Sequence, residues 1–458
     1  MRRKPLLKPL LAERSVEQPL GTAQSQENTL IQVGLHGPFR KIIFLGTCLM
    51  LATVYMGLAT REFFANYFSR KLDLASLQMA ARLDPGNADY QSRLGRYFLQ
   101  TQQEPEAAAQ FFTSATVLNP HNAAYWLELS RIYRRLANRD RQQDALQHAI
   151  AADPSTPDVA WDAANFYWAL GETDRALQEF RVVLENDPYL PAAALERCWR
   201  IKPDAGFLLR DVVPRNPEVY SSFLDFLVSR NESAAAARVW VQMAQLQQTV
   251  EPRHVFDYVR YLIDQREVEQ AQEVWQQAAS LGDLSGYQPS PENLVVNGDF
   301  SLPVLNGGFD WLYEKLPDVS LALDPTESHS GHRSLSIVFD SRGIEDAGIR
   351  QFIPVEPNTK YEFSAYFKSE GLEGAGGPRF LLEDRFTGAN YFASEELKDE
   401  GFWKQVGGTF ATGPDTRLVV LRIQRVPAGN AIRGKLWIAG VRLAQVHLTQ
   451  EQPAAGGQ

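Results

Sequence analysis

Five side chains in the C-terminal third of the chain have types and spacings that could form a binding surface: Tyr366, Glu383, Arg385, Arg422 and Gln424. Each belongs to a short run in which apolar and polar residues alternate, as in a strand with one buried face. The apolar residues of these runs are expected to face a core, so these five point away from it. Carboxylate, guanidinium and amide groups form planar hydrogen bonds with hydroxyls, and a tyrosine ring stacks on an apolar ring. The set suits a glycan, although a merely solvated sheet face shows the same alternation.

Catalytic arrangements are sparse in the sequence. The pairs Glu383-Asp384 and Glu395-Glu396 contain the residue types that glycosidases use. Adjacent strand residues point to opposite faces, so only one member of Glu383-Asp384 could serve a given groove. No phosphate-binding glycine loop, nucleophile elbow or zinc-protease motif occurs. We therefore expect a protein that is not an enzyme, and a glycan-active enzyme is the weakest of the alternatives.

Metal ligands are also scarce. The chain has two cysteines, Cys48 and Cys198, which excludes a zinc site built from cysteines. His329 and His332 lie three residues apart in a turn-like segment, without a third ligand at motif spacing. We expect no metal and no cofactor.

The polar residues of the first paragraph require a β-domain to position them. From residue 294 onward, short alternating runs are separated by Gly, Pro and Asn, a pattern typical of a β-sandwich. The expected strands are 319–323, 334–339, 349–355, 361–367, 380–386, 417–423 and 435–443.

Several motifs of this region resemble the jelly-roll carbohydrate-binding modules with a galactose-binding-like fold. They are the opening 293–300, then 308–311, 331–335, 361–366, 402–403 and 436–438, in that order. The resemblance covers 293–447 and implies a glycan-binding sandwich. Many such modules hold a structural calcium ion, but Ser301 and Ala439 stand where its acidic ligands would be, so calcium is not expected.

The region before the sandwich repeats itself. Asp-Pro or Asn-Pro dipeptides end at Pro85, Pro120, Pro154 and Pro188, separated by 35, 34 and 34 residues. Proline breaks a helix, and apolar and small residues recur at helical spacing between these prolines. The pattern resembles the tetratricopeptide repeat, with one extra residue in the turn near Pro105.

The repeat resemblance implies an all-α solenoid over 61–281 that binds a protein partner in its groove. We expect about five helical hairpins, with 191–200 as a single helix and the last two hairpins degenerate. A spacer without a ligand is the alternative. The Gly-, Pro- and Ser-rich residues 282–292 are interpreted as a linker to the sandwich.

An uncharged run at 42–60 is flanked by basic residues and reads as one membrane span. Its 19 residues would extend about 28 Å as a helix, close to the thickness of a hydrocarbon core. The preceding 41 polar residues are too long for a cleaved signal peptide, so the span is expected to remain as a signal-anchor.

Charge sets the expected orientation. Residues 1–41 carry seven Lys or Arg and three Glu, which favours a cytoplasmic N-terminus, although the residues closest to the span show no such bias. The bulk of the chain would then lie in the periplasm or otherwise outside the cytoplasm, anchored in a bacterial inner membrane. Residues 1–41 and 448–458 are expected to be disordered tails.

The composition limits the classes of partner. The chain has 458 residues, 44% hydrophobic and 22% charged, with a net charge of −9, which disfavours nucleic-acid binding. The sequence thus predicts a membrane-anchored scaffold or tethering protein in cell-surface polysaccharide assembly or export, with a protein partner on the repeats and a possible polysaccharide on the sandwich. The alternative is a pure protein-interaction scaffold whose sandwich is a structural cap.

Overall fold

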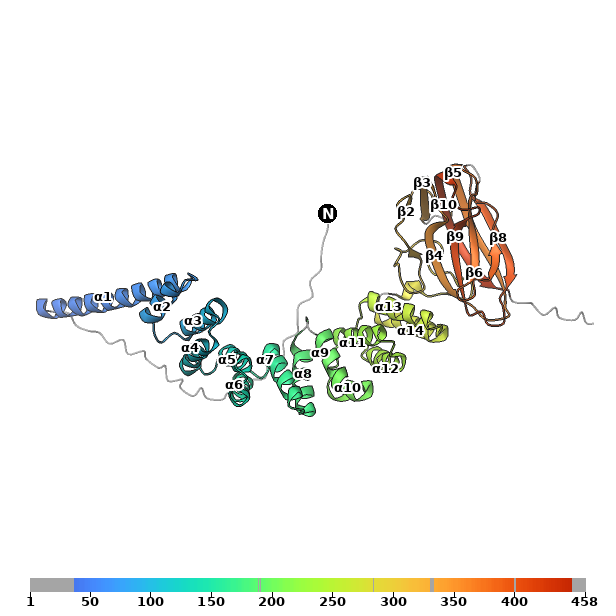
Figure 1. The fold of residues 1–458 in the computed structure, drawn as a ribbon. Coiled ribbons are helices and arrows are strands. Elements are labelled where there is room, and N and C mark those ends of the chain that lie inside the picture. Colours follow the sequence, from blue (N-terminus) through green and yellow to red (C-terminus); the bar gives the residue numbers. More distant parts are fainter. Residues whose placement is uncertain are drawn as a thin grey trace, which may run out of the picture. The chain divides into compact units, whose positions relative to one another are not determined.

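The computed structural model describes residues 37–187, 189, 191–282, 284–329, 333–398 and 401–446 (Figure 1). Of the two tails expected to be disordered, the described residues include only 37–41. His332 also lies outside the described residues. The chain divides into two compact units, one ending at Tyr97 and the other starting at Phe98.

The first unit is built on one long helix, α1 (Pro38–Ser69), which begins with a proline at a position where its missing N–H costs nothing. Within the described residues α1 is the one helix long and apolar enough to cross a membrane, and none of its apolar window is buried. It extends nine residues past the end of the predicted span. This extension packs Ala65 against α2 (Leu74–Leu83), which is followed by α3 (Ala88–Tyr97).

The second unit begins with a row of helices. Consecutive helices pair as hairpins from α5 onward, and their cores are built from small residues and aromatics, such as Ala149, Ala176 and Phe180, all fully buried. The helices are α4 (Pro105–Leu118), α5 (Ala123–Arg135), α6 (Arg139–Ala152), α7 (Pro157–Ala169), α8 (Thr173–Asn186), α9 (Pro191–Ile201), α10 (Ala205–Asp211), α11 (Pro217–Ser229), α12 (Ser233–Gln245), α13 (Pro252–Asp264) and α14 (Val268–Leu281).

Two details of the repeats differ from a regular array. The extra residue expected near Pro105 is accommodated by a π-helical turn, η1 (Phe98–Gln102), whose wider winding absorbs an insertion. The helix expected at 191–200 is present as α9, but it is not a single helix, because it has a partner, α10, with only seven residues. Helical periodicity could not reveal a segment of two turns that begins at Ala205, two residues after Pro203.

The sandwich consists of two five-stranded antiparallel sheets, ordered β1-β4-β9-β6-β7 and β2-β3-β10-β5-β8. All seven predicted strands are present. β1, β7 and β8 were not predicted, since two are very short and β8 contains two glycines. The strands are β1 (Leu312–Tyr313), β2 (Val319–Asp324), β3 (Ser334–Gly343), β4 (Asp346–Pro354), β5 (Lys360–Glu373), β6 (Pro378–Asp384), β7 (Asn390–Ala393), β8 (Lys404–Ala411), β9 (Leu418–Arg425) and β10 (Ala431–Gln445).

The core between the sheets follows the predicted parity. Phe363 from β5 lies with its ring centroid 5.3 Å from that of Phe380 on β6, and Leu421 and Ile423 of β9 face the same space. Arg425 also points inward and is 1% exposed. Its guanidinium donates to four backbone carbonyls, those of Ile344, Ala375, Gly376 and Asn430. A buried cation is tolerated there because each carbonyl replaces a water molecule.

The last hairpin and the sandwich share one hydrophobic core. Trp275 of α14 packs edge-on against Phe309, and Gly308 lies so close that a Cβ there would be 1.9 Å from the indole ring. The expected linker is not an extended tether. It contains a short turn, η2 (Ser285–Tyr287), and the Tyr287 carbonyl accepts a hydrogen bond from the Trp275 indole at 2.9 Å.

Candidate functional site

Four of the five predicted site residues lie on the same sheet. Glu383 and Arg385 come from β6 and the residue after it, and Arg422 and Gln424 come from β9, which pairs directly with β6. Arg379 lies opposite Gln424, and Arg350 of β4 lies opposite Arg422. We call the outward surface formed by Arg350, Arg379, Glu383, Arg422 and Gln424 the polar face.

Ion pairs hold the centre of the polar face in place. The Arg422 guanidinium lies 2.5 Å from the Glu383 carboxylate and 4.0 Å from that of Asp346. Burial raises the pKa of Asp346 above its ordinary value, although the positive charge of Arg422 acts in the opposite direction. Gln424 donates to the Glu345 carboxylate at 3.1 Å.

Arg385 links the sheet to the helical region. Its guanidinium lies 3.3 Å from the Asp264 carboxylate at the end of α13 and 5.5 Å from the centroid of the Phe352 ring. A crevice of about 400 Å³ opens beside this contact. Its walls come from α13, from the segment around β1, from β4 and from the residue after β6: Arg260, Asp264, Asn306, Leu312, Tyr313, Glu314, Arg350, Phe352 and Arg385. We call it the junction crevice.

Three arginines on this surface have unused hydrogen-bonding capacity. The Nε atoms of Arg379, Arg385 and Arg422 are buried, and no acceptor for them is found among the described residues. A buried donor without an acceptor costs about 1–3 kcal/mol, so such groups normally bond to water or to a ligand. Because these atoms are buried, an external hydroxyl reaches them only if neighbouring side chains move.

Tyr366 does not lie with the other four predicted residues. Its outward direction is as predicted, but β5 pairs with β10 and β8, so Tyr366 is on the opposite sheet. There its ring stacks on His329, with ring centroids 3.6 Å apart, and His329 is 5.8 Å from Trp403. A single groove formed by all five residues is therefore wrong. Alternation along a strand determines its inward and outward faces, but not which of the two sheets contains it.

The aromatic rings beside the polar face are those of Tyr313 and Phe352, which line the junction crevice together with Arg350. Tyr313 is 47% exposed, and both rings line the junction crevice together with carboxylates and guanidinium groups. The alternation of Ile349, Gln351 and Ile353 on β4 would have placed Phe352 outward. The contribution of α13 had no signal in the sequence.

The comparisons agree with this architecture. A family model described as carbohydrate binding domain matches residues 292–429, and one described as tetratricopeptide repeat matches residues 127–191. The C-terminal region is thus a carbohydrate-binding-type β-sandwich and the helical region carries tetratricopeptide repeats, which confirms both resemblances. No curated protein matches the sequence.

Solved structures similar to parts of the chain fall into the same two groups. The crystal structure of MamA is 21% identical, with 35% of this chain and 88% of that one covered and a TM-score of 0.27. A carbohydrate-binding module titled "CBM4 structure and function" is 15% identical, with 33% and 99% covered and a TM-score of 0.26. The CBM22-1 xylan-binding domain of Paenibacillus barcinonensis Xyn10C is 16% identical, with 33% and 94% covered and a TM-score of 0.24.

Proposed function

We propose that this protein is a membrane-anchored, non-enzymatic scaffold in cell-surface polysaccharide assembly or export. Helix α1 anchors it, the repeats bind a protein partner, and the polar face with the junction crevice binds a glycan. The observation that carries the glycan proposal is the Arg422–Glu383 pair on the polar face together with the Tyr313 and Phe352 rings in the junction crevice, which shares Arg350 with that face. Sugars require this combination of hydrogen-bonding groups and apolar ring surfaces.

The glycan site can be tested with the full-length protein in detergent on an oligosaccharide array. Because Tyr313 is half-exposed, Tyr313→Ala should leave folding intact and lower affinity by roughly five- to thirtyfold through loss of the aromatic contact. Arg422→Ala should lower affinity by about tenfold or more, since it removes charge-assisted hydrogen bonds.

Two controls accompany these variants. Arg433→Ala removes an exposed arginine from the opposite sheet, and Tyr366→Ala removes an aromatic ring there, so neither should change glycan affinity. If the wild-type protein binds no oligosaccharide, or if Tyr366→Ala is the variant that abolishes binding, the assignment to the polar face is wrong.

The proposed orientation predicts the behaviour of reporter fusions. An alkaline phosphatase joined after Gln458 should be active, because the excess of basic residues before α1 keeps the N-terminus in the cytoplasm. The same phosphatase fused before Met1 should be inactive. Activity of a cytoplasm-only reporter at Gln458 would place the sandwich inside the cell and rule out a role at a surface glycan.

A second candidate function is supported by the junction. One end of the sheet that carries the polar face is covered by the last hairpin, where Arg417 pairs with Glu269 at 2.7 Å and Leu418 joins the helical core. This packing suits a pure protein-interaction scaffold in which the sandwich caps the open end of the repeats. Absence of glycan binding in the array experiment would favour it.

A further inference from the structure

A pocket lies in the helical region where one helix is unusually short. The second helices of three successive hairpins are α8, α10 and α12, with 14, 7 and 13 residues. A cavity of about 740 Å³ lies beside this short helix, and its lining comes from α8, α10, α11, α12 and the segment that leads to α11. This volume is in the range of ligand-binding sites.

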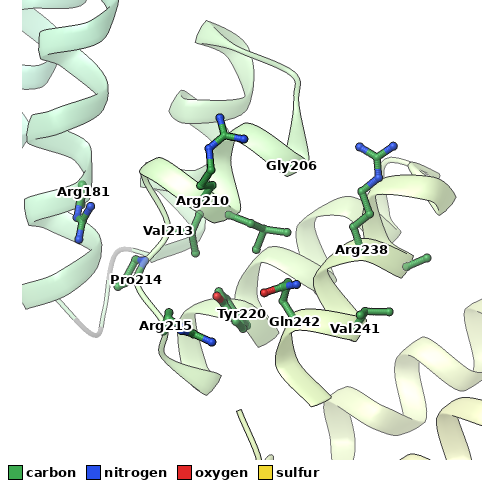
Figure 2. A pocket seen from close by; sticks show the side chains of 12 residues that line it. Arg181, Gly206, Arg210, Val213, Pro214, Arg215, Tyr220, Arg238, Val241 and Gln242 are labelled. Atoms are coloured by element: carbon green, nitrogen blue, oxygen red, sulfur yellow. The ribbon is translucent and has the colours of Figure 1, made fainter. Parts of the chain in front are cut away.

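Arginine side chains surround the pocket. Figure 2 shows Arg181, Arg210, Arg215 and Arg238 distributed around it, with Tyr220 and Gln242 between them. The lining residues include these four arginines and no carboxylate, although the whole chain has a net charge of −9. We call this cavity the arginine pocket.

Two of the four arginines are available for an external partner. Arg181 pairs with Glu185 at 2.7 Å, and Arg210 pairs with Asp211 at 2.8 Å. Within the described residues, Arg215 and Arg238 have neither an ion pair nor a hydrogen bond, and both are exposed. Arg215 therefore has no carboxylate partner among these residues. The carboxylate near Arg238 is that of Asp204, whose pKa is lowered by a backbone hydrogen bond from Phe207 and also by the charge of Arg238.

The pocket wall is apolar between the arginines. Leu209, Val213 and Val241 contribute side chains to it. The one aromatic residue, Tyr220, is 1% exposed, so its ring offers no stacking surface to a sugar. Cationic edges around an aliphatic wall complement a peptide that carries both acidic and aliphatic side chains.

We infer that the arginine pocket binds an acidic peptide segment of a partner protein, with an aliphatic side chain against the apolar wall and carboxylates on Arg215 and Arg238. This inference rests on the proposed protein-binding role of the repeats. The N-terminal segment of the chain itself is unsuitable as the occupant, since residues 1–41 carry an excess of basic charge. Binding through charge complementarity should weaken as salt is added.

The test uses the full-length protein in detergent and fluorescence anisotropy of a labelled short peptide composed of Glu, Asp and Leu. The wild-type protein should bind this peptide. It should not bind a second peptide in which Lys replaces every Glu and Asp. The double variant Arg215→Ala/Arg238→Ala should lose affinity by at least about tenfold, since two charge-assisted contacts disappear.

The matched control is Arg135→Ala/Arg139→Ala, which removes two exposed arginines from α5 and α6 and should retain wild-type affinity. The inference is overturned if the acidic peptide does not bind, if both double variants weaken binding equally, or if oligogalacturonate or inorganic phosphate displaces the peptide at a lower concentration than unlabelled peptide does. Glycan binding measured on the same protein samples reports separately on the sandwich, so failure of the two proposals can be distinguished.

Discussion

Replacing Phe363 by alanine should lower the free energy of unfolding of the sandwich by about 3–5 kcal/mol. The side chain is fully buried, and its ring centroid lies 5.3 Å from those of both Phe380 and Phe392, so truncation leaves a cavity between the sheets. Urea titration of the full-length protein, with hydrogen exchange followed in sandwich peptides, would measure the loss.

Tyr366→Ala is the matched control for this prediction. Tyr366 lies three residues further along β5 with its ring on the outer surface against His329, so its removal should change stability by much less than the loss of Phe363. If Tyr366→Ala unfolds the domain while Phe363→Ala does not, the inward and outward faces of β5 have been exchanged.

Trp275→Ala should destabilise the last hairpin and the sandwich together, also by about 3–5 kcal/mol. Trp275 is 1% exposed, and its ring fills the space that Gly308 leaves open by having no side chain. The variant also removes the hydrogen bond to the Tyr287 carbonyl, leaving that carbonyl without its indole donor. Protection from hydrogen exchange should fall in α13, α14 and the loop at 305–311 at the same urea concentration.

Trp403→Ala serves as the control of equal size, because Trp403, the residue directly before β8, is partly exposed and its loss should have a small effect. If Trp275→Ala lowers protection in α14 and leaves the sandwich unchanged, the two regions fold independently. The shared core would then contribute little to the position of the junction crevice.

The positions of the predicted site residues show that the sequence contains information about which strand face is buried, but not about which strands pair. Alternation along a strand reports burial of one face, and it correctly separated Phe363 from Tyr366 and Leu421 from Arg422. Burial is a local property, because each side chain is either removed from water or not. Pairing between distant strands is not local, so four predicted residues met on one sheet and Tyr366 did not.

The sequence by itself determined the order and type of the elements: an apolar helix, a series of helical hairpins and a sandwich of alternating strands. These follow from proline punctuation and from hydrophobic periodicity, which act over a few residues. Tertiary structure alone decided three features: the burial of Arg425 among four carbonyls, the junction crevice against α13, and the arginine pocket beside the short α10. Each of these features depends on groups that come together from separate segments. The free energy of such contacts depends on distances in space, and neighbouring residues in the chain do not specify those distances.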